Sequence, residues 1–166
     1  MPTSDDAKYP NRFNWATEPI AVTKGVLYRG PGNLRLDQLV AVGVKTIVDL
    51  RSEIRIDSGA LRRLGAEKVS YVHIPVIDDD LPTIDPVSKV LDLATDTSKH
   101  AVFVNCRAGM GRTGIFVACY RIADDAWAID DAIEEGRSLG LRLPAQEAFI
   151  RQFAAREMPS DRPAEL

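Results

Sequence analysis

The stretch "AVFVNCRAGMGRTGIFV", residues 101–117, contains the most unusual pattern in the sequence. An apolar run of the kind that forms a buried strand stops at Asn105. A cysteine, three glycines and two arginines follow within nine residues, and the next apolar run has the composition of a helix. A glycine-rich loop between a strand and a helix can hold a dinucleotide, or it can hold a reactive thiolate beside a phosphate.

The dinucleotide interpretation rests on "GMGRTG", residues 109–114, which matches the pattern G-x-G-x-x-G. In that motif the first glycine closes the strand, and a second strand ends in an acidic residue about 20 residues further on. Here Asn105 to Ala108 separate the apolar run from Gly109, and the chain after Gly114 has only helical patterns. No G-K-[ST] sequence is present, which also excludes a Walker loop. We therefore reject both nucleotide-binding interpretations.

A reactive thiolate accounts for every unusual residue of this loop. The thiolate is the nucleophilic form of cysteine, and lowering the usual pKa of ~8.5 requires a positive potential. A helix that begins near Arg112, inward-turned backbone N–H groups and the guanidinium supply that potential and also suit a phosphate dianion. Gly109 and Gly111 let the backbone amides turn inward. Arg112 can bind two phosphate oxygens, and Thr113 can donate a hydrogen bond to the sulfur of Cys106.

Outside this stretch, strand-like and helix-like segments alternate along the chain. "VLYRG", "VKTIVDL" and "KVSYVHIPV" have the pattern of strands, and segments with helical periodicity lie between and after them. This alternation predicts an α/β fold with a mainly parallel central sheet flanked by helices. Ligands of such sheets bind beyond the carboxyl ends of the strands. Arg51, Asp78 and Cys106 each follow a different predicted strand, so we expect them at one edge of the sheet.

The size and composition fit one domain that does not bind nucleic acid. The chain has 166 residues, of which 45% are hydrophobic, and a formal net charge of −3. Its apolar runs are too short for a membrane span, and its polar start is unlike a signal peptide. The two cysteines, Cys106 and Cys119, do not have a metal-binding spacing. These features predict a cytoplasmic protein.

"VNCRAGMGRTG", residues 104–114, resembles the signature Cys-x5-Arg-[Ser/Thr] of the cysteine-dependent protein tyrosine phosphatase superfamily. "GVLYRGPGN", "GVKTIVDLRSE" and "YVHIPVID" together resemble its small dual-specificity-like branch. The resemblance implies a protein tyrosine phosphatase-like fold in a single phosphatase domain, with a core over about residues 13–157 and flexible ends. It implies a phosphocysteine intermediate on Cys106, stabilised by Arg112, with no metal and no cofactor. The phosphate-binding residues that it implies are Arg107, Ala108, Gly109, Met110, Gly111 and Thr113.

An aspartate after a strand is expected to supply the proton for the leaving group. Breaking a P–O bond to an alkoxide or a phenolate requires a general acid, and members of the superfamily carry an upstream aspartate, often in a Pro-x-x-Asp pattern. In "IPVIDDDLP", Asp78 lies three residues after Pro75, so it is the predicted acid and later the base. Asp79 is the second candidate and Asp80 the third. Gln146 on the last helix is a candidate for positioning the attacking water.

The sequence departs from the superfamily at Asn105, where a histidine is usual. Asparagine can donate hydrogen bonds but carries no charge, so the departure bears on catalytic efficiency more than on mechanism. It also keeps open a non-catalytic module that binds phosphorylated ligands.

Three further arginines have less specific expected roles. Arg29 can contact a substrate phosphate or form an ion pair. Arg51 is expected to pair with Asp49 or Glu53. Arg107 is expected to point to solvent, where it would tune the surface charge of the loop.

The predicted substrate is phosphotyrosine in proteins, with phosphoserine and phosphothreonine also considered. The alternative is an inositol phosphate or a phosphoinositide. Relatives that act on such ligands often have lysines in the loop, whereas here Arg107 is the basic residue within it. The expected partner is therefore a phosphorylated protein or a small phosphorylated molecule, without nucleic acid and without a membrane span. The oligomeric state is left open.

Overall fold

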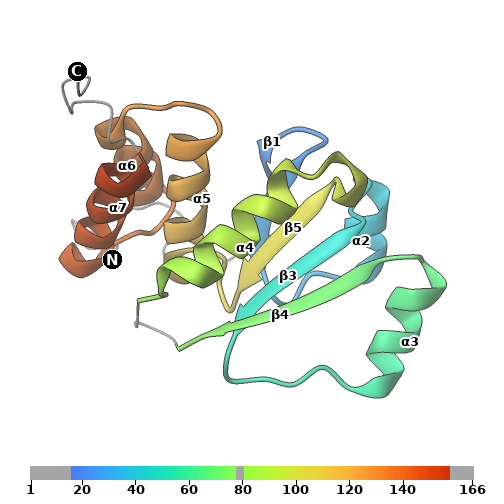
Figure 1. The fold of residues 1–166 in the computed structure, drawn as a ribbon. Coiled ribbons are helices and arrows are strands. Elements are labelled where there is room, and N and C mark those ends of the chain that lie inside the picture. The colour runs from blue at the N-terminus through green and yellow to red at the C-terminus, as the bar shows by residue number, and fades with distance from the viewer. Residues whose placement is uncertain (1–15, 78–80, 158–166) are drawn as a thin grey trace.

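The computed structural model describes residues 16–77 and 81–157. Five strands form one sheet in the order β1-β2-β5-β3-β4 (Figure 1). The parallel strands are β2 (Leu27–Pro31), β3 (Thr46–Arg51), β4 (Ser70–Val76) and β5 (Val102–Cys106), and β1 (Ile20–Thr23) runs antiparallel to β2. The predicted α/β fold with a mainly parallel sheet is confirmed. The sequence patterns do not predict β1, which has only four residues.

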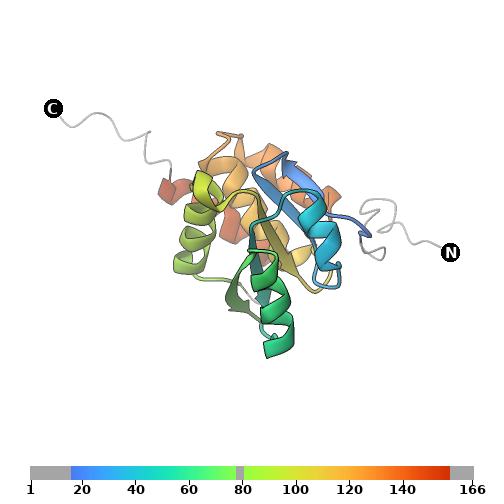
Figure 2. The same cartoon turned by 90° about the vertical axis from the view of Figure 1, so that its right-hand side faces the viewer.

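Helices cover both faces of the sheet (Figures 1 and 2). One face carries α2 (Leu36–Ala41) and α3 (Ser58–Ala66), and the other carries α4 (Ile84–Thr95), α5 (Gly111–Ala123), α6 (Ile129–Ser138) and α7 (Pro144–Glu157). A 3-10 turn, η1 (Thr97–Lys99), leads into β5. Two hydrophobic clusters result, a large one between the sheet and α4–α7 and a small one between the sheet and α2 and α3. No helix in the described ranges is both long and apolar enough to cross a membrane.

The side chains of β5 alternate between these two clusters, as the pleat of a strand requires. Val104 and Cys106 belong to the large cluster, whereas Phe103 belongs to the small one. Asn105 therefore lies on the face of α2 and α3. Two adjacent residues of the phosphatase-like signature thus face opposite sides of the sheet.

The carboxyl ends of the parallel strands meet at one edge. Pro31 pairs with Cys106 and Arg51 pairs with Val76 in the strand register. The expectation that Arg51 and Cys106 emerge at the same edge is confirmed, whereas Asp78 lies outside the described residues. The predicted domain limits, about residues 13 and 157, stay a prediction because residues 1–15 and 158–166 also lie outside them.

Candidate active site

The predicted nucleophile lies where β5 ends and a loop leads into α5. Cys106 is the last residue of β5, and its residue surface is 3% exposed. The helix begins at Gly111, close to the start expected at Arg112. The N–H groups of the first helical turn, which have no acceptor within the helix itself, are therefore part of the same loop as the thiol, and they favour a negative charge there.

The loop is held from behind by hydrogen bonds to its carbonyl groups. The carbonyl of Arg107 accepts a hydrogen bond of 3.1 Å from the backbone of the residue after β2, and that of Gly109 accepts one of 2.7 Å from a β2 side chain. A trans peptide is planar, so the N–H of the next residue points the opposite way. The N–H groups of Ala108 and Met110 consequently point away from β2. Convergent backbone donors of this kind suit an anion.

The β2 side chain that holds the loop is Arg29. Its residue surface is 1% exposed, and Nη2 donates to the carbonyls of Gly109 at 2.7 Å and Met110 at 3.4 Å. Burial lowers the pKa of Arg29 to about 10, although Cys106 acts in the opposite direction. The expected ion pair of Arg29 is wrong, because its described contacts are to loop carbonyls and not to a carboxylate. A contact with a substrate phosphate stays a prediction. Because β2 pairs with β5, Arg29 lies next to the strand that leads into the loop.

Position 109 requires glycine for a steric reason as well as for the orientation of its amide. Its φ is +78°, and a Cβ there would lie 2.4 Å from the carbonyl carbon of Gly30. Because that neighbour is backbone and cannot move aside, only glycine allows the loop to pack so closely on β2.

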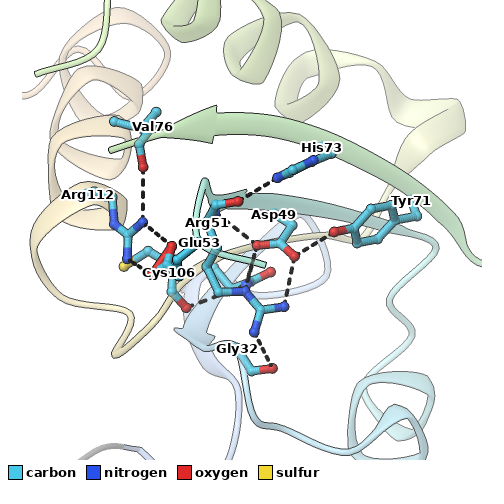
Figure 3. A network of polar contacts seen from close by, with 10 residues as sticks. Gly32, Asp49, Arg51, Glu53, Tyr71, His73, Val76, Cys106 and Arg112 are labelled. Atoms are coloured by element: carbon cyan, nitrogen blue, oxygen red, sulfur yellow. Dashed lines mark hydrogen bonds and ion pairs between the residues drawn. The ribbon is translucent and has the colours of Figure 1, made fainter. Parts of the chain in front are cut away.

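Arg112 is buried at the start of α5 and is held in position from two sides. Its residue surface is 2% exposed. Nη1 donates to Glu53 Oε1 at 2.7 Å and to the carbonyl of Val76 at 3.0 Å, and Nη2 donates to Glu53 Oε2 at 2.9 Å. Figure 3 shows Arg112 and Cys106 at the same end of the sheet. The guanidinium of Arg112 is thus preorganised at the edge where Cys106 lies.

Glu53 is the residue of this arrangement that sequence reasoning missed. The sequence suggests it only as a partner of Arg51, yet it forms a two-point ion pair with Arg112. The hydrogen bonds from Arg112 lower the pKa of Glu53 to about 2. Its position two residues after β3, at the edge that was expected to carry the site, was the available signal.

A polar network lies behind the loop, on the face of α2 and α3 (Figure 3). Asp49 is fully buried and accepts hydrogen bonds from Arg51 Nε and Nη2, both 2.8 Å, from the Tyr71 hydroxyl at 2.6 Å and from Asn105 Nδ2 at 3.1 Å. Burial would raise the pKa of Asp49, but the bonds from Arg51 and Tyr71 outweigh it and keep this pKa below its usual range. The predicted pairing of Arg51 with Asp49 is confirmed. Asn105, in the place of the usual histidine, is held by a carboxylate.

The remaining candidates occupy three different environments. Arg107 is exposed, as expected. Gln146 is buried on α7, where its Oε1 accepts hydrogen bonds from the backbone N–H groups of Arg142 and Leu143. Thr113 is fully buried, and its hydroxyl makes no hydrogen bond to the described residues. The expected bond from Thr113 to the Cys106 sulfur is therefore not formed in this structure.

The candidates for the general acid follow strand β4 in the sequence. Asp78, Asp79 and Asp80 lie outside the described residues. The preceding strand β4 ends at Val76, and the carbonyl of Val76 accepts a hydrogen bond from Arg112. Val76, the last residue of β4, therefore lies directly beside the guanidinium.

Sequence comparisons relate the chain to phosphatases and to NAD kinases. A family model described as "DSP-PTPase phosphatase fused to NAD+ Kinase" matches residues 20–152. The dual specificity protein phosphatase TpbA of Pseudomonas aeruginosa is 32% identical over 111 residues, which are 66% of this chain and 49% of that protein. NAD kinase 2, chloroplastic, of Arabidopsis thaliana is 31% identical over 90 residues, which are 52% of this chain and 9% of that protein. The chain thus spans half the length of these relatives or less.

Solved structures share the fold. The crystal structure of P. aeruginosa TpbA has a TM-score of 0.61 at 26% identity and covers 80% of this chain and 86% of its own. The core catalytic domain of the PP-IP phosphatase SIW14 from S. cerevisiae has a TM-score of 0.70 at 18% identity, covering 86% of this chain and 88% of its own. The latter similarity shows the fold alone. Because the family model matches most of the chain, the chain belongs to the family of DSP-PTPase phosphatases that this model describes.

Proposed function

We propose that this protein hydrolyses phosphate monoesters through a phosphocysteine intermediate. The observation that carries the proposal is the arrangement at one sheet edge. Cys106 ends β5, backbone N–H groups point away from β2, and Glu53 holds the buried guanidinium of Arg112 beside them. Such a site acts mainly by positioning and by electrostatic stabilisation, as phosphoryl transfer requires.

The proposed reaction has two steps. In the first, the Cys106 sulfur forms a bond to phosphorus while the P–O bond to the leaving group breaks, and Asp78 donates its proton to the leaving oxygen. In the second, water attacks the phosphocysteine, the carboxylate of Asp78 takes a proton from it, and the sulfur leaves as thiolate with release of orthophosphate. Arg112 and the backbone amides of residues 107–112 stabilise the transferred group in both steps.

The proposed substrate is phosphotyrosine in proteins, with phosphoserine and phosphothreonine as further substrates. The similarity to the dual specificity protein phosphatase TpbA supports this choice. An inositol phosphate or phosphoinositide is the second candidate, because the fold is shared with a PP-IP phosphatase and with PTPMT1 in complex with PI(5)P. A rate panel of phosphotyrosine peptides, phosphoserine peptides and inositol phosphates decides between them. A cytoplasmic location also stays a prediction, which cell fractionation tests.

The mechanism is tested with p-nitrophenyl phosphate in the presence of a chelator. We expect turnover without added metal, inhibition by vanadate, and a phosphorylated Cys106 in the mass spectrum of rapidly quenched protein. Cys106→Ser should abolish turnover and keep ligand binding, whereas Cys119→Ser is the matched control, because Cys119 is fully buried in the core. Turnover by Cys106→Ser would refute the thiolate mechanism. Phosphopeptide binding without any turnover by the wild type would instead support the non-catalytic module.

The acid is tested by replacing the aspartates singly. Asp78→Asn should slow hydrolysis most for substrates with poor leaving groups, because these need the proton most. A small effect at Asp78 together with a large one for Asp79→Asn would move the assignment to Asp79.

A further inference from the structure

A pocket of about 310 Å³ lies on the face of the sheet opposite to Cys106, between the sheet and helices α2 and α3. The two helices have only six and nine residues, so they leave part of this face uncovered. A volume of this size is at the lower end of the range for small-molecule sites, ~300–1,000 Å³. We call it the rear pocket. The phosphatase reaction proposed above makes no use of it.

About half of the rear pocket's lining is apolar, and these apolar side chains come from three parts of the fold. Leu34 and Leu39 line it from the side of α2, Leu64 from α3, and Ile47 and Phe103 from the sheet. Walls of this kind favour a flat apolar or aromatic group over a polar one.

One end of the rear pocket carries a hydrogen-bond acceptor without a donor. Asn105 lines the pocket and is 2% exposed. Its Nδ2 donates to Asp49, and this assignment follows because a carboxylate can only accept. Its Oδ1 accepts no hydrogen bond from the described residues. This oxygen lines the pocket, so a hydroxyl group on a ligand could donate a hydrogen bond to it.

The charge of the rear pocket is positive. Asp49 is neutralised by its two-point pair with Arg51 at the same end. Arg63 of α3 also lines the pocket, is exposed and has no ion pair with a carboxylate in the described part of the chain. An exposed guanidinium at an apolar pocket suits a carboxylate on the ligand.

We propose that the rear pocket is a binding site for a small aromatic carboxylate that carries a hydroxyl group. The ring lies between the leucines and Phe103, the hydroxyl donates to Asn105 Oδ1, and the carboxylate meets Arg63. Since Asn105 and Cys106 face opposite sides of the sheet, the ligand and a phosphoryl group bind at the same time. Binding in the rear pocket does not require catalysis, so it can be tested independently of the proposed phosphatase function.

Three simple probes test this chemistry on the full chain by NMR titration, with saturating orthovanadate present to occupy the catalytic loop. The first probe, 4-hydroxyphenylacetate, carries the aromatic ring, the hydroxyl and the carboxylate. Phenylacetate lacks the hydroxyl and should bind about fivefold more weakly, because it cannot form the one hydrogen bond to Asn105 Oδ1. Tyramine replaces the carboxylate by an amine and should bind at least about two- to fivefold more weakly, because attraction to Arg63 becomes repulsion.

Two substitutions locate the site. Arg63→Gln should weaken 4-hydroxyphenylacetate about two- to fivefold and leave tyramine no weaker. Ala60→Leu, which fills the pocket from α3, should prevent binding of all three probes, with circular dichroism showing that the variant is folded. The proposal is overturned if 4-hydroxyphenylacetate does not bind, if orthovanadate displaces it, or if folded Ala60→Leu binds it as the wild type does.

Discussion

The ion pair between Glu53 and Arg112 leads to the sharpest prediction for this protein. Glu53 engages both terminal nitrogens of the buried guanidinium, at 2.7 and 2.9 Å. Glu53→Gln keeps the size of the side chain but removes its charge and one of its two acceptor oxygens. We expect the variant to be less stable at neutral pH, and we expect its Arg112 to be held less firmly beside Cys106.

The size of the stability loss follows from the pKa of Glu53. A fall from 4.5 to about 2 corresponds to roughly 3 kcal/mol. Because 37% of the Glu53 side chain is exposed, solvent screening reduces this to about 1–2 kcal/mol. The pKa is lower in the folded protein, so the contribution is fully present above pH 4.5 and is lost as the pH falls toward 2.

Urea unfolding of wild type and Glu53→Gln at pH 7 and at pH 3 measures this dependence. The difference in the free energy of unfolding should be about 1–2 kcal/mol at pH 7 and clearly smaller at pH 3. In p-nitrophenyl phosphate assays, kcat/KM should fall about 10- to 100-fold, because a displaced guanidinium stabilises the transition state poorly. Glu67→Gln is the matched control, since no interaction of the Glu67 side chain is found within the described residues.

Two results would refute this reasoning. A destabilisation of equal size at pH 7 and pH 3 would show that the ionised carboxylate is not the source of the effect. An unchanged kcat/KM in a variant that is destabilised at pH 7 would show that Arg112 is positioned without Glu53.

Three further predictions concern the support of the loop. Arg29→Met should lower kcat/KM about tenfold or more and cost about 1–3 kcal/mol in the free energy of unfolding, because the loop carbonyls of Gly109 and Met110 lose their donor; unchanged activity would contradict it. Gly109→Ala should cost at least about 2 kcal/mol in urea unfolding, and clearly more than Gly25→Ala, which has the same φ of +78° but open space around it. Tyr71→Phe removes the 2.6 Å hydrogen bond to Asp49 and should cost about 1.5–3 kcal/mol by the same measurement; a neutral effect would mean that Arg51 suffices for Asp49.

The alternation of strands and helices could be predicted because it is a periodic property of short segments. Strand β5, the start of α5 and the shared edge of Arg51 and Cys106 all follow from such patterns and from the rule for parallel strands. The short strand β1 could not be predicted in this way, since its four residues gain their conformation from pairing with β2. The support that Arg29 gives to the loop could not be predicted for the same reason, because it depends on which strand lies next to β5.

The sequence by itself determined the chemistry of the loop. The thiol, the glycines and the arginine six residues later lie within one short stretch, so their relation depends on local geometry alone. Only the tertiary structure decided what holds that loop in place. Glu53 and Arg112 are 59 residues apart, Arg29 and Gly109 are 80 apart, and Asp49 and Asn105 are 56 apart. Contacts over such separations arise from the order of strands in the sheet, which periodic patterns in a single sequence do not specify.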